Sequence, residues 1–193
     1  MNSKKYLETI KVENGEVFHL AFHQERLNEA IGSSKVILKE IILPPAEGLF
    51  RCRVVYDELS FSVNYFPYQK RDIRTLKLVY DDTIAYEKKY YDRSRIEHLT
   101  MQKKLCDDIL IVKEGLITDT SIANVVFKYK NNWITPKKPL LKGTTRRRYI
   151  QNKKIFEEDI GVKDLAKFQK VGLLNAMIDF DIIRNDNIKE IIC

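Results

Sequence analysis

The chain has 193 residues, of which 44% are hydrophobic and 32% are charged. Such a composition is typical of one or two globular domains and excludes a disordered chain. No apolar run approaches the roughly 20 residues that span a membrane. The first ten residues lack the apolar region of a secretion signal, so we expect a cytoplasmic protein with no membrane partner.

The net charge of +7 is compatible with two kinds of partner. One is a nucleic acid, since basic proteins bind phosphate backbones. The Lys and Arg residues are scattered, however, and no nucleic-acid motif accompanies them, so a basic surface that attracts small anionic substrates is equally compatible. The cysteines, Cys52, Cys106 and Cys193, are odd in number and far apart. This spacing predicts isolated reduced thiols rather than a disulfide framework or a zinc cluster.

The first part of the chain, residues 4–80, carries the signals of an antiparallel sheet with helices. An Asn-Gly pair between apolar runs predicts a hairpin, and apolar residues at helical spacing predict a helix that ends at Gly32. Three blocks then alternate between apolar and polar residues, which predicts three antiparallel strands. The expected elements are two strands in 4–22, a helix in 23–34, a helix or a strand in 35–47, and three strands in 49–80.

The second part of the chain mixes strands with short helices. A polar stretch leads into a helix with Ile96 and Leu99 on one face, and a strand follows that ends at a Gly turn. The composition change near residues 81–86 predicts two domains, residues 1–82 and residues 83–193. The expected elements are a helix within 81–106, a strand in 107–115, a hairpin in 124–136, a Gly turn and helix in 141–156, a short helix in 162–168, and a buried strand from 170.

Two positions have residue types that bind anions. Arg26 follows His23 by about one helical turn, and it is either a solvated residue or a guanidinium that grips a phosphate through paired hydrogen bonds. Gly143 precedes a helix that starts with Thr144 and Thr145. These hydroxyls either cap the helix or join the backbone N–H groups and the helix dipole in binding an anion.

Two further positions suit a carbonyl compound and a charged heterocycle. Lys88 and Lys89 lie beside tyrosines; they either belong to a solvated face or include a desolvated lysine that forms a Schiff base. Asp119 interrupts the apolar run 114–127, and it either caps a turn or holds a positive charge on a bound heterocycle. A lysine, a carboxylate, an arginine and a helix N-terminus are together the parts of a site for pyridoxal phosphate. No metal site is expected.

The order and spacing of these residues resemble the class IV aminotransferase family, the fold type IV pyridoxal-phosphate enzymes, over nearly the whole chain. The family includes branched-chain aminotransferase, D-alanine aminotransferase and 4-amino-4-deoxychorismate lyase. The resemblance is densest in residues 106–146, where CDDILIV precedes GLITDTSIAN, a strand that ends in TP, and LLKGTTR. It implies an α/β fold, more narrowly α+β, of two domains, a short version of the D-amino-acid aminotransferase-like fold. The small first domain would be residues 1–82, and residues 83–193 would carry most cofactor contacts.

The resemblance assigns a role to each of the candidate positions. The lysine that binds the cofactor as an imine precedes an aspartate–arginine pair, here in KYYDR, which implies Lys89 rather than its neighbour Lys88. The phosphate-gripping arginine of the pattern H-x-x-R-L falls on Arg26 in HQERL. The other cofactor-binding assignments are Thr144 and Thr145 for the phosphate, Asn175 and Ala176 of LLNAM for closing the phosphate site, and Asp119 for the pyridine nitrogen.

Asp119 stands where most of the family has glutamate. A carboxylate beside the pyridine nitrogen keeps that nitrogen protonated, because an opposite charge favours the charged form, and the ring then accepts electrons from the substrate carbon. Aspartate is one methylene shorter than glutamate. The carboxylate therefore requires a closer ring, a closer backbone or a bridging water. Ser121 and Asn124 would belong to the same wall around the cofactor.

The resemblance implies an enzyme that acts on a small amino substrate as a homodimer, and it leaves two reactions open. We favour a 4-amino-4-deoxychorismate lyase, which releases pyruvate and leaves 4-aminobenzoate, because YDRS, LLKGTTR and NAM are closer to lyase-type domains. The alternative is an aminotransferase for D-amino or branched-chain amino acids. A second alternative is a protein that binds the cofactor or a nucleic acid without turnover, although nucleic acid is not an expected partner. The candidates for binding the substrate carboxylate are Arg51, Arg53, Tyr65 and Arg71.

Overall fold

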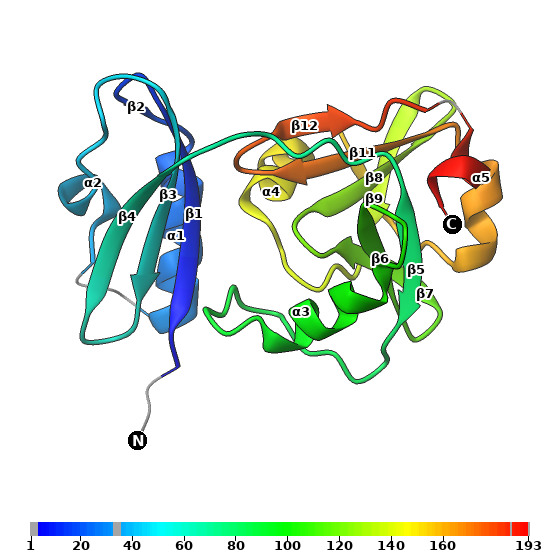
Figure 1. The fold of residues 1–193 in the computed structure, drawn as a ribbon, viewed down its shortest axis with the longest axis horizontal. Helices are drawn as coiled ribbons and strands as arrows, with labels where there is room; N and C mark the ends of the chain where they lie inside the picture. Colours follow the sequence, from blue (N-terminus) through cyan, green and yellow to red (C-terminus); the bar gives the residue numbers. More distant parts are fainter. Residues whose placement is uncertain (1–3, 33–35, 186, 193) are drawn as a thin grey trace. The chain divides into compact units, whose positions relative to one another are not determined.

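The structure is a computed structural model, and it describes residues 4–32, 36–185 and 187–192 (Figure 1). The chain forms two compact units. The first comprises Met1–Lys70 and Lys88–Asp92, and the second comprises Arg71–Glu87 and Arg93–Cys193. The sequence placed the division between residues 82 and 83. In the structure the chain enters the second unit at residue 71 and returns briefly to the first, because residues 5–7 hydrogen bond with residues 89–91.

The first unit is a four-stranded antiparallel sheet in the order β2-β1-β3-β4, with helix α1 across one face (Figure 1). The predicted hairpin forms because Asn14 and Gly15 both take positive φ angles, 49° and 81°, as a two-residue hairpin turn requires. The elements are β1 (Tyr6–Glu13), β2 (Glu16–Val17), α1 (Leu20–Ile31), α2 (Leu38–Ile41), β3 (Leu49–Tyr56) and β4 (Phe61–Pro67).

The two faces of this sheet differ in what they carry. One face packs its apolar side chains, among them Ile10 and Val54, against Leu27 of α1 and Leu38 of α2. Because side chains alternate along a strand, Arg51 and Arg53 lie on the opposite face. Tyr65 pairs with Cys52, which belongs to the helix-covered cluster, so Tyr65 lies on the helix side. The register therefore separates Tyr65 from the two arginines.

Two predictions about the first part of the chain are wrong. Residues 20–22 were expected in a strand, but α1 begins at Leu20, which lies two helical turns before Leu27 and packs on the same cluster. The third strand of the predicted antiparallel set, β5 (Leu76–Tyr80), pairs parallel with a strand of the second unit. Alternation along a strand predicts its two faces but not its partner, so this pairing could not be read from the sequence.

The second unit is built on an eight-stranded sheet in the order β10-β9-β8-β7-β6-β5, to which β11 adds beside β8 and β12 beside β11. Its predicted hairpin in 124–136, the helix after Gly143 and the buried strand from residue 170 are all present. The remaining elements are α3 (Ser94–Thr100), η1 (Met101–Lys103), β6 (Asp108–Lys113), β7 (Leu116–Thr120), β8 (Asn124–Tyr129), β9 (Asn132–Pro136), α4 (Thr144–Gln151), β10 (Phe156–Glu158), η2 (Val162–Lys167), β11 (Lys170–Asn175), β12 (Asp179–Ile182) and α5 (Ile188–Ile191).

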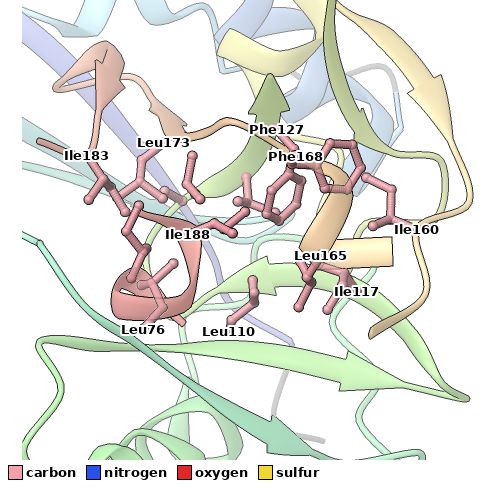
Figure 2. Close-up of a cluster of buried hydrophobic side chains, with 14 of the residues drawn as sticks. Leu76, Leu110, Ile117, Phe127, Ile160, Leu165, Phe168, Leu173, Ile183 and Ile188 are labelled. Atoms are coloured by element: carbon pink, nitrogen blue, oxygen red, sulfur yellow. The ribbon is translucent and has the colours of Figure 1, made fainter. Parts of the chain in front are cut away.

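Strand β8 is covered on both faces. Val125 and Phe127 face the main hydrophobic cluster, where the Phe127 and Phe168 rings stack with their centroids 4.9 Å apart (Figure 2). Val126 faces a smaller cluster that includes Leu174 and residues of α4. A strand buried on both sides has a continuous apolar run rather than an alternating one. This explains the unbroken NVVF segment, and it makes β8 a rigid base for the polar residues before it.

Three further observations concern cysteines, membranes and metals. Cys52 is a buried free thiol, whereas Cys106 is disulfide-bonded, so the prediction of three isolated thiols is wrong for Cys106; Cys193 lies outside the described residues. Within residues 4–32, 36–185 and 187–192, no helix is long and apolar enough to cross a membrane. In the same ranges no group of three or more His, Cys, Asp or Glu side chains could hold a metal ion.

Replacing Gly172 of β11 with alanine should lower the free energy of unfolding by about 1–3 kcal/mol, because overpacking a core forces its neighbours apart. A Cβ there would lie 2.5 Å from a ring carbon of Phe180 and 2.9 Å from a side-chain carbon of Val126. Gly161→Ala is the control, because the nearest atom there, a carboxylate oxygen of Asp164 at 3.3 Å, can shift. Urea unfolding measures both variants, and equal losses would contradict this packing argument.

Candidate active site

In the first unit, Arg26 is held by a buried carboxylate. Arg26 Nε donates to Glu8 Oε1 at 2.8 Å, and Arg26 Nη2 donates to Glu8 Oε2 at 2.5 Å. His23 Nδ1 lies 2.6 Å from the same Oε2 atom. The sequence singled out Arg26 and His23 but not Glu8. The signal was present in β1, because Tyr6, Glu8 and Ile10 alternate to the buried side, and a charge at the centre of such a series is unusual.

The pKa values of this cluster follow from burial and from the arginine. Burial would raise the pKa of Glu8, but the charge and hydrogen bonds of Arg26, with the hydrogen bond of His23, lower it to about 2. Burial lowers the pKa of His23, and Arg26 and Lys89 lower it further, against the opposing effect of Glu8. His23 is therefore neutral at neutral pH. Its Nδ1 carries the proton, because only a protonated nitrogen can donate to a carboxylate.

The structure distinguishes the two neighbouring lysines. Lys88 Nζ donates to the backbone oxygen of Ala30 at 2.9 Å and lies 5.6 Å from the centre of the Tyr6 ring. Lys89 is anchored through its backbone oxygen, which accepts from Leu7 N at 2.9 Å. Its charge is close enough to His23 to lower the pKa of that residue. Lys88 thus has a structural contact with α1, while Lys89 shares the neighbourhood of Arg26.

The open face of the first sheet carries a pocket of about 380 Å³. Arg53 lines it, with its guanidinium 5.8 Å from the centre of the Tyr91 ring. Among the residues that the structure describes, neither Arg53 nor Lys5 pairs with a carboxylate, and no acidic residue lines the pocket. Its lining residues are Lys5, Arg53, Val55, Ser62, Asn64, Phe66 and Tyr91.

The other candidates for the substrate carboxylate are placed differently. Arg51 is exposed on the same face as Arg53 and lies over the Phe66 ring at 5.4 Å. Tyr65 lies on the opposite, helix-covered face. Arg71 is an exposed residue of the second unit, where its charge lowers the pKa of Asp108 against a larger raising effect of burial. Of the four candidates, only Arg53 lines the pocket.

In the second unit, Asp119 is buried and is held by two neutral donors. Asn124 Nδ2 donates to Asp119 Oδ1 at 2.7 Å, and the backbone N–H of Leu141 donates to Oδ2 at 2.9 Å. Asp119 and Asn124 are cross-strand partners of β7 and β8. A tight turn joins the strands, with Thr120 Oγ1 accepting from Ala123 N at 3.0 Å. This turn accounts for the spacing of Asp119 and Asn124 in the sequence.

Burial raises the pKa of Asp119 to about 6, against the lowering effects of Leu141 N–H, the Asn124 amide and the Arg146 charge. A buried carboxylate that lacks a close cation is costly when ionised. A positive charge brought next to it would stabilise the ionised form. Asp119 is thus suited chemically to face a protonated ring nitrogen.

Asn124 also fixes the chain that leads into α4. Its Nδ2 donates to the backbone oxygen of Leu141 at 2.8 Å, in addition to its bond with Asp119. Its Oδ1 lies against Gly143, so that a Cβ at residue 143 would collide with it. Only glycine therefore fits at residue 143. Sequence reasoning treated this glycine as the start of a helix and missed its contact with Asn124.

The N-terminus of α4 presents a set of hydrogen-bond donors. Thr144 and Thr145 are 6% and 4% exposed, and their hydroxyls bond to none of the residues that the structure describes. The first N–H groups of a helix have no partner within it, and the helix dipole makes this end favourable for an anion. Two buried threonines with unused hydroxyls at such an end fit a phosphate group.

Asn175 organises a turn in the same unit. Its Oδ1 accepts from the backbone N–H groups of Met177 and Ile178 at 2.9 and 3.1 Å, and its Nδ2 donates to Ile122 O at 3.3 Å. Ala176 is half-buried within this turn. The side chain of Asn175 therefore ties residues 176–178 to the turn between β7 and β8. The second unit thus links the predicted residues Asp119 and Asn175 through one turn.

Comparisons with known proteins identify the family of the chain. The family model for class IV amino-transferases matches residues 88–185. An uncharacterised protein of Haemophilus influenzae is 38% identical over 180 residues, which are 88% of this chain and 96% of that protein. The chain belongs to the class IV aminotransferase family, whose members are pyridoxal-phosphate enzymes.

Solved structures show the same fold. A candidate 4-amino-4-deoxychorismate lyase from Haemophilus somnus superposes with a TM-score of 0.84 at 37% identity, covering 92% of this chain and 98% of that one. A hypothetical aminotransferase from Mycobacterium tuberculosis in its pyridoxal-phosphate-bound form gives a TM-score of 0.77 at 16% identity, covering 98% and 84%. The predicted fold class, a fold type IV pyridoxal-phosphate enzyme, is confirmed.

Asp119→Asn should remove a pH dependence from the stability of the cofactor-free protein. The folded-state pKa of about 6 lies above the ordinary value of 3.8. Asp119 therefore contributes stability that is fully present below about pH 4 and is lost as pH rises through 6. The shift corresponds to a loss of about 3 kcal/mol.

Urea unfolding between pH 4 and 8 measures this effect as the change with pH in the difference between wild type and Asp119→Asn. The absolute difference also contains a lost hydrogen bond, because the new amide group faces a donor. Only the pH-dependent part reports the titration of Asp119. A constant difference across the range would contradict the raised pKa.

Proposed function

We propose that the protein is a pyridoxal-phosphate-dependent lyase that acts on 4-amino-4-deoxychorismate, releasing pyruvate and leaving 4-aminobenzoate. The observation that carries this proposal is the pocket beside Arg53. Two cations, Lys5 and Arg53, and two rings, Phe66 and Tyr91, line it with no acidic residue. This lining suits a cyclic substrate with two carboxylates better than an apolar amino acid. The Haemophilus somnus protein, a candidate for the same lyase activity, supports the assignment.

The cofactor-binding roles follow from the chemistry of each residue. Lys89 would bind the cofactor aldehyde and Asp119 the ring nitrogen. Arg26, Thr144 and Thr145 would bind the phosphate through a guanidinium, two hydroxyls and the backbone N–H groups of α4. Asn175 and Ala176 would close the phosphate site through the turn that Asn175 organises. When bound, pyridoxal phosphate supplies an electron sink for the substrate carbon.

The protein's own residues would then move one proton. Once the substrate amine has replaced Lys89 on the cofactor, the freed Lys89 amine would take the proton from the carbon that bears the substrate amino group. The bond between the ring and the enolpyruvyl oxygen breaks, and the ring becomes aromatic. A proton returned to the methylene carbon of the departing enolpyruvyl group gives pyruvate, so atoms and charge balance. Ionised Asp119 would stabilise the positive charge of the ring nitrogen.

An aminotransferase for D-amino or branched-chain amino acids is the alternative function. It would use the same proton transfer by Lys89 but would return the proton elsewhere and require a second, keto-acid substrate. Two cations and no acidic residue line the pocket, which suits the carboxylates of the lyase substrate better than a branched apolar side chain. A homodimer, expected from the family, is part of the proposal and would be measured by light scattering.

Lys89→Ala should abolish the near-visible absorption of the lysine-bound cofactor and the release of 4-aminobenzoate from aminodeoxychorismate. Lys88→Ala is the matched control, and it should keep both, because Lys88 bonds to Ala30 O. Absorption spectra measure the cofactor band, and chromatography measures the release of 4-aminobenzoate. Conversion of D-alanine to pyruvate, or of leucine to its keto acid, by wild type with a keto-acid acceptor, and with no 4-aminobenzoate from aminodeoxychorismate, would support the aminotransferase instead. Absence of the absorption band from wild type would contradict a cofactor role for Lys89.

Arg53→Gln should raise KM for aminodeoxychorismate by about tenfold or more, because it removes a hydrogen-bonded charge from a substrate carboxylate. Arg51→Gln is the control, since Arg51 is exposed on the same sheet face but does not line the pocket. Steady-state kinetics with both variants make the comparison. Equal KM values for wild type and Arg53→Gln would argue against this pocket as the carboxylate site.

A further inference from the structure

A carboxylate lies in the hydrophobic cluster of the first unit. Glu8 is 0% exposed, on a strand whose neighbouring inward residues, Tyr6 and Ile10, belong to the cluster. Burying an ionised carboxylate is costly unless it is paired and hydrogen-bonded. An apolar residue at this position would pack the core without that cost. The presence of glutamate therefore indicates that its charge acts on another residue.

That residue is Arg26. A guanidinium offers two edges for paired hydrogen bonds, and Glu8 takes the edge formed by Nε and Nη2, at 2.8 and 2.5 Å. Occupation of one edge fixes the plane of the guanidinium and the direction of its other edge. An arginine otherwise loses much rotamer freedom when it binds a ligand. The fork with Glu8 removes this freedom before any ligand arrives.

Glu8 is itself prevented from turning. Its Oε2 is shared by Arg26 Nη2 and His23 Nδ1, the latter at 2.6 Å. His23 is 1% exposed, and its neutral form donates from Nδ1. Tyr56, 2% exposed, places its hydroxyl near the same carboxylate, which together with burial raises the pKa of Tyr56. Buried groups from α1 and β3 thus hold the carboxylate of Glu8 on β1, and through it the guanidinium of Arg26.

We propose that Glu8 and His23 are positioning residues that aim Arg26 at the phosphate of the cofactor. The inference rests on the proposed role of Arg26. Glu8 cancels the charge of Arg26, so the contribution of Arg26 to phosphate binding comes from the direction of its hydrogen bonds more than from net charge. Directional bonds select a phosphate group specifically. Loss of Glu8 should therefore weaken the preference for pyridoxal phosphate over pyridoxal, which has the same ring and aldehyde but no phosphate.

The test is the ratio of dissociation constants for pyridoxal and pyridoxal phosphate, measured by absorption with wild type, Glu8→Gln and Arg26→Met. We expect Glu8→Gln to lower this ratio by about tenfold or more. The double variant that combines Glu8→Gln with Arg26→Met should have a ratio no lower than that of Arg26→Met alone. Glu16→Gln, at an exposed glutamate of β2, is the matched control. A loss of fold rigidity alone would weaken the binding of both ligands equally and leave the ratio unchanged.

The outcomes separate the inference from the proposal on which it rests. A reduced ratio in Arg26→Met with an unchanged ratio in Glu8→Gln would overturn the positioning role alone. An unchanged ratio in Arg26→Met would remove the phosphate role of Arg26, and the inference with it. If Glu8→Gln does not fold, His23→Leu removes one bond to Glu8 and keeps the ion pair. A reduced ratio in that variant supports the inference, and an unchanged one overturns it.

Discussion

The hydrogen bonds of Asn124 are the constraint on which the site in the second unit depends. One amide group joins the carboxylate of Asp119 to the backbone of Leu141, just before the turn that opens α4. The same side chain leaves no room for a Cβ at Gly143. The strand pair β7–β8, the carboxylate and the N-terminus of α4 are therefore fixed together. A displacement of Asn124 would move the carboxylate and the turn that opens α4 at once.

Two of the buried carboxylates, Glu8 and Asp119, have opposite electrostatic surroundings. Glu8 has a cation as its partner, and its pKa is about 2. Asp119 has neutral donors within hydrogen-bond distance, and its pKa is about 6. A carboxylate with a permanent cation orients that cation, whereas one without a cation close by can receive the charge of a ligand. The difference in partners thus matches the difference in proposed roles, Glu8 as an orienting group and Asp119 as a binding group.

The sequence predicted those features that depend on a few neighbouring residues. The Asn14-Gly15 hairpin, the end of α1 at Gly32 and the helix after Gly143 follow from local backbone preferences, and the family motif assigned roles to the candidate cofactor residues. It did not predict features that depend on partners far along the chain. The parallel pairing of β5 with β6, the side of the sheet that Tyr65 occupies and the ion pair of Glu8 with Arg26 join residues by register and packing. A single sequence contains no signal for such partners, apart from the inward position of Glu8.

The length of the aspartate side chain at position 119 matches the positions of its two hydrogen-bond donors. Both of its oxygens are fixed by donors that belong to β8 and to the chain before α4, at 2.7 and 2.9 Å. A glutamate here would carry its carboxylate one methylene further from β7, away from the Asn124 amide or the Leu141 N–H. It would lose at least one of these bonds while still buried, at a cost typical of an unsatisfied charged group. The shorter side chain is therefore matched to its two donors, and any ring nitrogen that it binds must approach this fixed carboxylate.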